Sequence, residues 1–92
     1  MRPLTMSWKV KISNQAREDL DYFRAYDKST YETCHDLTNR LASEPYEGPG
    51  KPMPAAELGG DVWFRRVSLE HRMVYEVFQD LIIVASYRNH LE

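Results

Sequence analysis

The sequence predicts an α+β fold in which an N-terminal strand and a two-helix antiparallel hairpin pack on an antiparallel β-sheet. Three observations support this: a short alternating segment near the N-terminus, two apolar stripes with helical spacing, and three β-rich segments in the last third of the chain. Ninety-two residues suffice for one two-layered domain. We therefore assign 1–92 to a single domain, with 1–6 and 91–92 as extensions of it.

The first strand is expected from Trp8 to Ile12, where apolar and basic residues alternate. Ser13 or Asn14 then caps a helix over 15–26. This helix has one apolar stripe, which consists of Ala16, Leu20 and Phe23. The pattern places Asp19 outside the stripe, among the solvent-facing polar residues.

A second helix is expected to follow the break at Asp27 and to continue to about residue 43. Ser29 and Glu32 match a capping box, and Asp27 is an alternative cap. The apolar stripe of this helix consists of Tyr31, Cys34, Leu37 and Leu41. Two helices so close in sequence form an antiparallel hairpin, and Cys34 is expected in the core.

The segment from Glu44 to Gly60 contains four of the five prolines and all four glycines, so neither a helix nor a central strand is expected there. Loops of this length in small domains are usually functional or disordered. Three β-rich segments follow, at 62–68, 72–78 and 81–88. The very short link between the first two predicts a β-hairpin.

Arg72 lies inside one of these predicted strands rather than in a loop. Alternation along the strand places Arg72 on the same face as Val74 and Glu76. A guanidinium fixed on a sheet is well oriented to bind two oxygens of a phosphate or carboxylate. The alternative is an ordinary ion pair of Arg72 with Glu70 or Glu76.

The composition, with 42% hydrophobic and 28% charged residues, is typical of a soluble globular protein. The longest apolar run, at 81–85, is far shorter than the roughly 18 residues that a membrane span needs. Cys34 is the only cysteine, and the N-terminus lacks the apolar core of a signal peptide. We therefore expect a cytoplasmic protein that does not interact with membranes.

The net charge of -2 is a poor overall match for a phosphate-rich partner, but the charges are unevenly distributed. The second half of the chain contains a set of cationic candidates for phosphate binding: Lys51, Arg65, Arg66, Arg72, Arg88 and His90. No phosphate-loop, zinc-binding or serine-nucleophile signature is present, and the histidines lack metal-ligand spacing. We therefore expect neither a metal nor a cofactor.

Three ordered motifs resemble those of one protein family. Residues 45–54, Pro-Tyr-Glu-Gly-Pro-Gly-Lys-Pro-Met-Pro, resemble its P-F-x-G-x-G-K-P-E-P segment. Residues 63–67, Trp-Phe-Arg-Arg-Val, and 70–75, Glu-His-Arg-Met-Val-Tyr, resemble its W-S-R-R-I and E-H-R-L-V-Y segments. The family is the YoeB/Txe branch of the RelE-like bacterial toxins, and the similarity extends from about Trp8 to His90.

The resemblance implies a toxin of a type II toxin–antitoxin system that cleaves mRNA in the ribosomal A site. It implies an antitoxin protein, the ribosome and mRNA as partners, contact with DNA only through the antitoxin, and homodimerisation as an open alternative. By position, Arg72 is the phosphate-stabilising arginine and His90 the general acid. Arg66 falls on a strand arginine that helps to hold the phosphate, and Lys51 lies in the matching loop and is a candidate for phosphate binding.

The chain departs from the family pattern at three places. Met53 replaces the glutamate expected as general base, Ala56 replaces a basic residue, and 91–92 replaces a terminal aromatic. Glu57 is the candidate for a substitute base, with Glu47 as an alternative. A second reading is a family member with little or no nuclease activity, which acts by binding its antitoxin or the ribosome and by co-repression.

Overall fold

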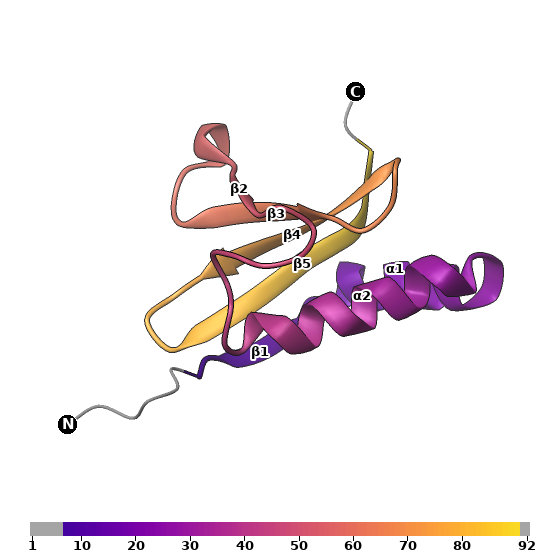
Figure 1. The fold of residues 1–92 in the computed structure, drawn as a ribbon, viewed down its shortest axis with the longest axis horizontal. Helices are drawn as coiled ribbons and strands as arrows, with labels where there is room; N and C mark the ends of the chain where they lie inside the picture. Colours follow the sequence, from indigo (N-terminus) through magenta and orange to yellow (C-terminus); the bar gives the residue numbers. More distant parts are fainter. Residues whose placement is uncertain (1–6, 91–92) are drawn as a thin grey trace.

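The computed structural model describes residues 7–90, except for the side chains of residues 89 and 90. Its elements are β1 (Lys9–Ile12), α1 (Asn14–Tyr26), α2 (Lys28–Leu41), β2 (Met53–Pro54), the 3₁₀ helix η1 (Ala56–Leu58), β3 (Val62–Arg66), β4 (His71–Val77) and β5 (Leu81–His90). Both helices lie on the same side of the sheet (Figure 1). The predicted α+β class is confirmed, whereas the predicted extensions lie outside the described residues.

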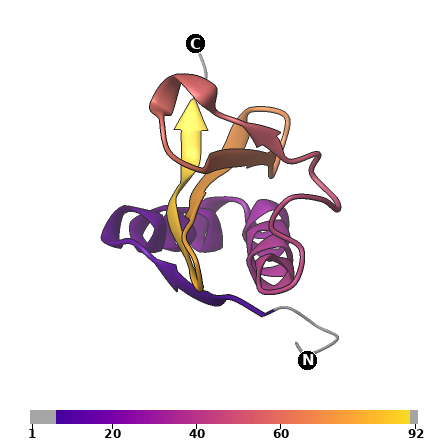
Figure 2. The ribbon, with the colours of Figure 1, turned by 90° about the vertical axis from the view of Figure 1, so that its left-hand side faces the viewer.

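The sheet has the strand order β1-β5-β4-β3-β2. Strands β3, β4 and β5 pair antiparallel, as expected, and β2 also pairs antiparallel with β3. Strand β1 instead pairs parallel with β5, with Lys9 opposite Leu81. The sheet is therefore mixed: the three strands predicted in the last third of the chain are antiparallel, whereas β1, whose pairing the sequence did not predict, is parallel. Because β1 and β5 are not joined by a tight turn, nothing in their connection forces them to be antiparallel. Figure 2 shows β1 at one edge of the sheet, beneath the helices.

Both helices begin at a capping side chain. The Ser13 hydroxyl oxygen accepts a hydrogen bond from the Ala16 N–H at 3.0 Å, which confirms Ser13 as the first cap. At α2 the cap is Asp27, whose carboxylate accepts from the Thr30 N–H and, at 2.7 Å, from the Thr30 hydroxyl. These bonds lower the pKa of Asp27. Ser29 lies inside the helix, so the capping box was the wrong alternative.

The core lies between the helices and the facing side of the sheet. One cluster of buried side chains combines the helical stripes with alternate strand residues: Ala16, Phe23, Cys34, Leu37, Leu41, Val67, Met73, Tyr75, Val77, Ile82, Val84 and Tyr87. The core position of Cys34 is confirmed. Asp19 is only 3% exposed, so its predicted place on the solvent face of the helix is wrong. Within residues 7–90, no helix is long and apolar enough to cross a membrane.

The Gly/Pro-rich segment contains two short elements that the sequence did not predict. Met53 and Pro54 pair with Phe64 and Trp63 and form an edge strand, β2. Proline is tolerated at a sheet edge because the lost N–H has no ladder partner there. The 3₁₀ helix η1 follows and turns the chain toward β3.

Tyr87 limits the stability of the fold at alkaline pH. Burial raises its pKa to about 12 from the ordinary value of 10.0, and its hydroxyl lies 2.6 Å from Thr38 Oγ1. Because the folded-state pKa is raised, the stability that neutral Tyr87 contributes is present below about pH 10 and is lost as the pH rises to about 12. We expect Tyr87→Phe to flatten this fall by roughly 2 kcal/mol, measured by urea denaturation across the range.

The matched control for this experiment is Tyr26→Phe, since the Tyr26 side chain is 77% exposed. This variant should retain the wild-type alkaline profile. An alkaline profile of Tyr87→Phe that is superimposable on the wild type would contradict the assignment.

Candidate anion-binding site

Two arginines lie side by side on the face of the sheet that turns away from the helices. Arg66 on β3 is directly opposite Arg72 on β4. The guanidinium of Arg72 lies 4.8 Å from the centre of the Phe64 ring, a cation–π contact that fixes its orientation. No ion pair of Arg72 with Glu70 or Glu76 is observed among the described residues. The geometry therefore favours the anion-receptor reading of Arg72 over the ion-pair reading.

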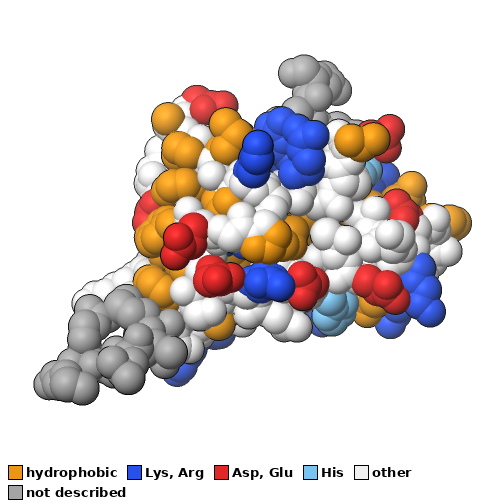
Figure 3. Space-filling model, in the orientation of Figure 1, with side chains coloured by type: hydrophobic (Ala, Val, Ile, Leu, Met, Phe, Trp, Pro, Cys, Tyr) orange, Lys and Arg blue, Asp and Glu red, His pale blue; other side chains and the backbone are white. Residues whose placement is uncertain are grey.

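A groove of about 630 Å³ lies over this pair. It is lined by Gly50, Lys51, Met53, Phe64, Arg66, Val67, Ser68, Leu69 and Arg72. Figure 3 shows Lys and Arg side chains gathered near this end of the sheet, whereas acidic and basic side chains alternate along the helical side. The groove thus combines three cations with an apolar wall, which suits a phosphate attached to a larger group.

The loop that contributes Lys51 is fixed to the end of β3. The Gly50 carbonyl accepts a hydrogen bond from the Arg66 N–H at 3.0 Å. Gly50 has φ 86°, and a Cβ there would lie 3.0 Å from the Arg66 carbonyl oxygen, so glycine is required for this close approach. Lys51 itself has φ 49° and precedes a proline, which is a disfavoured conformation for a residue with a side chain. Backbone strain is therefore located at the groove.

Met53 lies in the groove, opposite Phe64 in the β2–β3 pairing. A carboxylate at position 53 would consequently face the arginine pair. Among the described lining residues there is no carboxylate. Glu57 is exposed on η1 and Glu47 is exposed in the loop before β2, and neither lines the groove.

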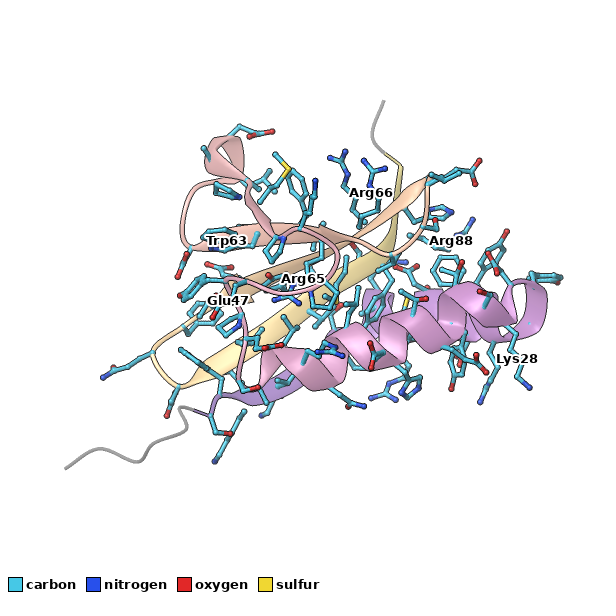
Figure 4. All side chains as sticks on the ribbon, viewed as in Figure 1. Lys28, Glu47, Trp63, Arg65, Arg66 and Arg88 are labelled. Atoms are coloured by element: carbon cyan, nitrogen blue, oxygen red, sulfur yellow. The ribbon has the colours of Figure 1, made fainter. Side chains whose placement is uncertain are left out.

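Arg65, a predicted phosphate-binding residue, faces the opposite way. It is fully buried, and Figure 4 shows it between the sheet and α2, whereas Arg66 points away from the helices. Its guanidinium donates to the backbone carbonyls of Glu44, Glu47 (2.7 Å) and Pro49 (3.4 Å). The prediction that Arg65 contacts RNA is therefore wrong: strand alternation directs it into the protein, where it binds the loop.

Tyr75 completes the attachment of this loop. Its hydroxyl accepts from Arg65 Nε at 3.2 Å and donates to the Pro45 carbonyl at 2.6 Å. Burial raises the pKa of Tyr75, so the hydroxyl keeps the proton that this second bond requires. The two side chains hold the loop, and with it Lys51, at the edge of the groove.

Strand β5 contributes to the same end of the sheet. Asn89 is opposite Arg72 and His90 is opposite His71 in the β4–β5 pairing. The side chain of His90 lies outside the described residues, so its predicted role stays a prediction. Arg88 lies outside the groove, with its guanidinium 3.5 Å from the centre of the Tyr22 ring on α1.

Sequence reasoning missed Phe64 and Leu69 as groove residues. The signal for Phe64 was its spacing of two from Arg66, which places both on one face of a strand. Leu69 is 91% exposed in the hairpin turn, and no periodicity marks it. No group of three or more potential metal ligands occurs among residues 7–90 whose side chains are described.

Comparison with known proteins identifies relatives over nearly the whole chain. Residues 12–91 match the family described as the YoeB-like toxin of bacterial type II toxin–antitoxin systems. The toxin YoeB of Escherichia coli K12 is 33% identical over 82 residues, which cover 89% of this chain and 98% of the relative.

Solved structures show the same fold. The structure of the YoeB dimer from Staphylococcus aureus is 33% identical and superposes with a TM-score of 0.80, covering 92% of this chain and 99% of the other. The YoeB–YefM complex from S. aureus is 32% identical with a TM-score of 0.76, covering 91% and 98%.

Substitutions of Arg65 and Arg66, which are adjacent in sequence, should have very different effects on stability. Arg65→Met leaves several buried carbonyl oxygens without donors, so we expect it to lower the free energy of unfolding by about 3 kcal/mol or more. Arg66→Met, on the exposed face, should change it by no more than about 0.5 kcal/mol. Chemical denaturation of the two variants measures this difference. Similar losses in both would show that Arg65 does not hold the loop.

Proposed function

Because the family match spans residues 12–91, the chain belongs to the YoeB-like toxins of bacterial type II toxin–antitoxin systems, and we propose that it is a ribosome-dependent endoribonuclease that cleaves mRNA in the A site. The observation that carries this proposal is the pairing of Arg66 with Arg72 across an open sheet face, beside Lys51. Such a set of rigid donors suits a phosphodiester, whose two non-bridging oxygens each need a partner.

In the proposed reaction, the ribose 2′-oxygen attacks the adjacent phosphorus and the bond from phosphorus to the 5′-oxygen breaks. The products are a 2′,3′-cyclic phosphate and a 5′-hydroxyl. A base removes the 2′-hydroxyl proton, an acid protonates the departing 5′-oxygen, and cations stabilise the added charge on the phosphorane oxygens. We assign this stabilisation to Arg72, and the binding of the phosphate to Arg66 and Lys51.

The proposed acid is His90. An imidazole titrates near neutral pH, so its protonated form releases a proton to the 5′-oxygen without a large change in pKa. Its backbone lies next to that of Asn89, which is opposite Arg72. The register places position 90 at the same end of the sheet as Arg72, and the role of His90 at the phosphate is proposed from the family resemblance.

The base is the open element of the mechanism. The Met53 thioether has no useful affinity for a proton at neutral pH. Glu57 follows four residues later, on the 3₁₀ helix directly after β2, and its carboxylate is exposed. We propose Glu57 as the proton acceptor when RNA fills the groove, because binding and cleavage geometries often tighten only in the complex.

A second candidate function is binding without efficient cleavage. The lack of a carboxylate among the described groove residues favours it. In this reading the arginine pair and Lys51 still hold an anionic partner, and the protein acts on the ribosome or, with its antitoxin, as a co-repressor that contacts DNA indirectly. The groove chemistry required for phosphate binding is the same in both readings.

The partners follow from the family. We propose an antitoxin chain that binds this protein, as YefM does in the S. aureus complex, and the ribosome with its mRNA as the target. Homodimerisation is also proposed, since the S. aureus relative is described as a dimer.

Cleavage is tested by in vitro translation of a reporter mRNA with the purified protein, with the new ends mapped by primer extension. We expect ends inside A-site codons, and a loss of about a hundredfold or more in Arg72→Ala because charge stabilisation in the transition state is removed. Arg24→Ala is the matched control, since Arg24 makes only a surface ion pair with Asp21. Equal cleavage by wild type and Arg72→Ala would refute the assignment of Arg72.

Met53→Glu distinguishes the two functions. Position 53 faces the arginine pair, so a glutamate there supplies a proton acceptor within the groove. If the wild type cleaves through Glu57, Glu57→Gln should abolish cleavage. Adding Met53→Glu to the Glu57→Gln variant should then restore it. If the wild type binds ribosomes but does not cleave and Met53→Glu does, the binding function is the native one.

A further inference from the structure

The carboxyl end of β5 does not run in regular register with β4. Val74 is opposite Ser86, whereas Arg72 is opposite Asn89, so β5 advances three residues while β4 advances two. The extra residue lies at Tyr87 and Arg88. This is a β-bulge, placed immediately before the residues that pair with the start of β4.

A buried carboxylate on α1 binds this bulge. Asp19 Oδ2 accepts hydrogen bonds from the backbone N–H groups of Tyr87, at 2.8 Å, and Arg88, at 3.0 Å. Its other oxygen accepts from the Gln15 amide at 2.9 Å. Asp19 is therefore fully engaged, although no cation pairs with it among the described residues.

One oxygen accepts from both of these N–H groups because the strand is irregular there. In a regular strand, consecutive N–H groups point to opposite edges and do not converge on one atom. Asp19 is thus complementary to the bulged form of β5 and not to the regular form. Hydrogen bonds to a charged group are stronger than those between neutral groups, so two of them favour one register over another.

The regular form would change which residue of β5 lies opposite Arg72. Without the bulge, the pairing of Val74 with Ser86 would continue as Arg72 opposite Arg88 and His71 opposite Asn89. Two guanidinium groups would then oppose each other, and His90 would be displaced by one position. In the observed structure Arg88 instead stacks on Tyr22 of α1, away from the groove.

We infer that Asp19 is a positioning residue: by binding the bulge at Tyr87 and Arg88, it fixes the register that places Asn89 opposite Arg72 and His90 opposite His71. The register role depends on the structure alone. Its consequence for catalysis rests on the proposed function, in which His90 is the acid.

Disulfide cross-linking measures the register without any nuclease assay. Cysteines at directly opposite positions of antiparallel strands are close enough to form a disulfide. Two double variants are compared. Arg72→Cys/Asn89→Cys reports the observed register, and Arg72→Cys/Arg88→Cys reports the regular register. Cys34 is fully buried, which keeps it out of the reaction.

With Asp19 present, the 72–89 pair should form the disulfide in preference to the 72–88 pair. Asp19→Ala should lower this preference by at least about tenfold, because two hydrogen bonds to the bulge are lost. Should Asp19→Ala fail to fold, Asp19→Asn replaces it, since the asparagine oxygen still accepts from the bulge and a smaller shift is expected. A folded Asp19→Ala or Asp19→Asn variant with the wild-type preference overturns the inference.

Cleavage then tests the link to the site. In the wild-type cysteine background, Asp19→Ala should lower kcat by about a hundredfold while KM changes by no more than about threefold, since an acid moved by one residue affects the transition state more than phosphate binding. Asp19→Asn should restore part of kcat. Asp21→Asn, which removes an exposed carboxylate from the same helix, should retain full activity.

The two proposals fail separately. Lack of cleavage by the wild-type protein refutes the proposed nuclease but leaves the cross-linking ratio to decide the role of Asp19. Cleavage by wild type with an unchanged kcat in Asp19→Ala refutes the positioning role.

Discussion

The buried guanidinium of Arg65 is the interaction on which the candidate site depends. It binds three backbone carbonyls of the irregular segment between α2 and β2 and the hydroxyl of Tyr75. Carbonyl groups in a segment without regular structure have no ladder partners, so a multivalent donor is needed wherever they are buried. By supplying one, Arg65 attaches the loop to the sheet and places Lys51 beside the exposed arginines.

Strand alternation divides the basic residues into a buried set and a set that lines the groove. Arg65 and Arg66 are neighbours in sequence, yet one is enclosed by the loop and the other faces the groove. The same alternation puts Phe64 beneath the Arg72 guanidinium. An acidic protein is thus able to present a local cationic surface, because what a phosphate meets is the local arrangement of charges and not their sum.

Cleavage of a phosphodiester needs both stabilisation of negative charge and removal of a proton, and the described part of the groove offers residues for only the first. In the proposed reaction Arg66, Arg72 and Lys51 would supply the charge stabilisation, whereas the described lining residues include no carboxylate for proton removal. Met53 occupies the place from which such a carboxylate would act. The cationic residues and the position that a base would occupy therefore come from different elements of the fold. Asp19 adds a third element, since it binds the bulged backbone of β5 close to the end of that strand.

The sequence by itself determined the α+β class, the helical stripes, the hairpin and the face of the strand on which Arg72 lies, because these follow from local periodicity and turn chemistry. Tertiary structure alone decided the parallel pairing of β1, the burial of Arg65 and Asp19, and the edge strand at Met53. Each of these depends on a partner elsewhere in the chain: strand β5 for β1, a loop carbonyl for Arg65, a bulge amide for Asp19 and strand β3 for Met53. Local periodicity contains no information about such distant partners. For this reason Arg65 and Asp19, which the pattern places among solvent-facing or RNA-facing residues, are buried and stabilise the fold.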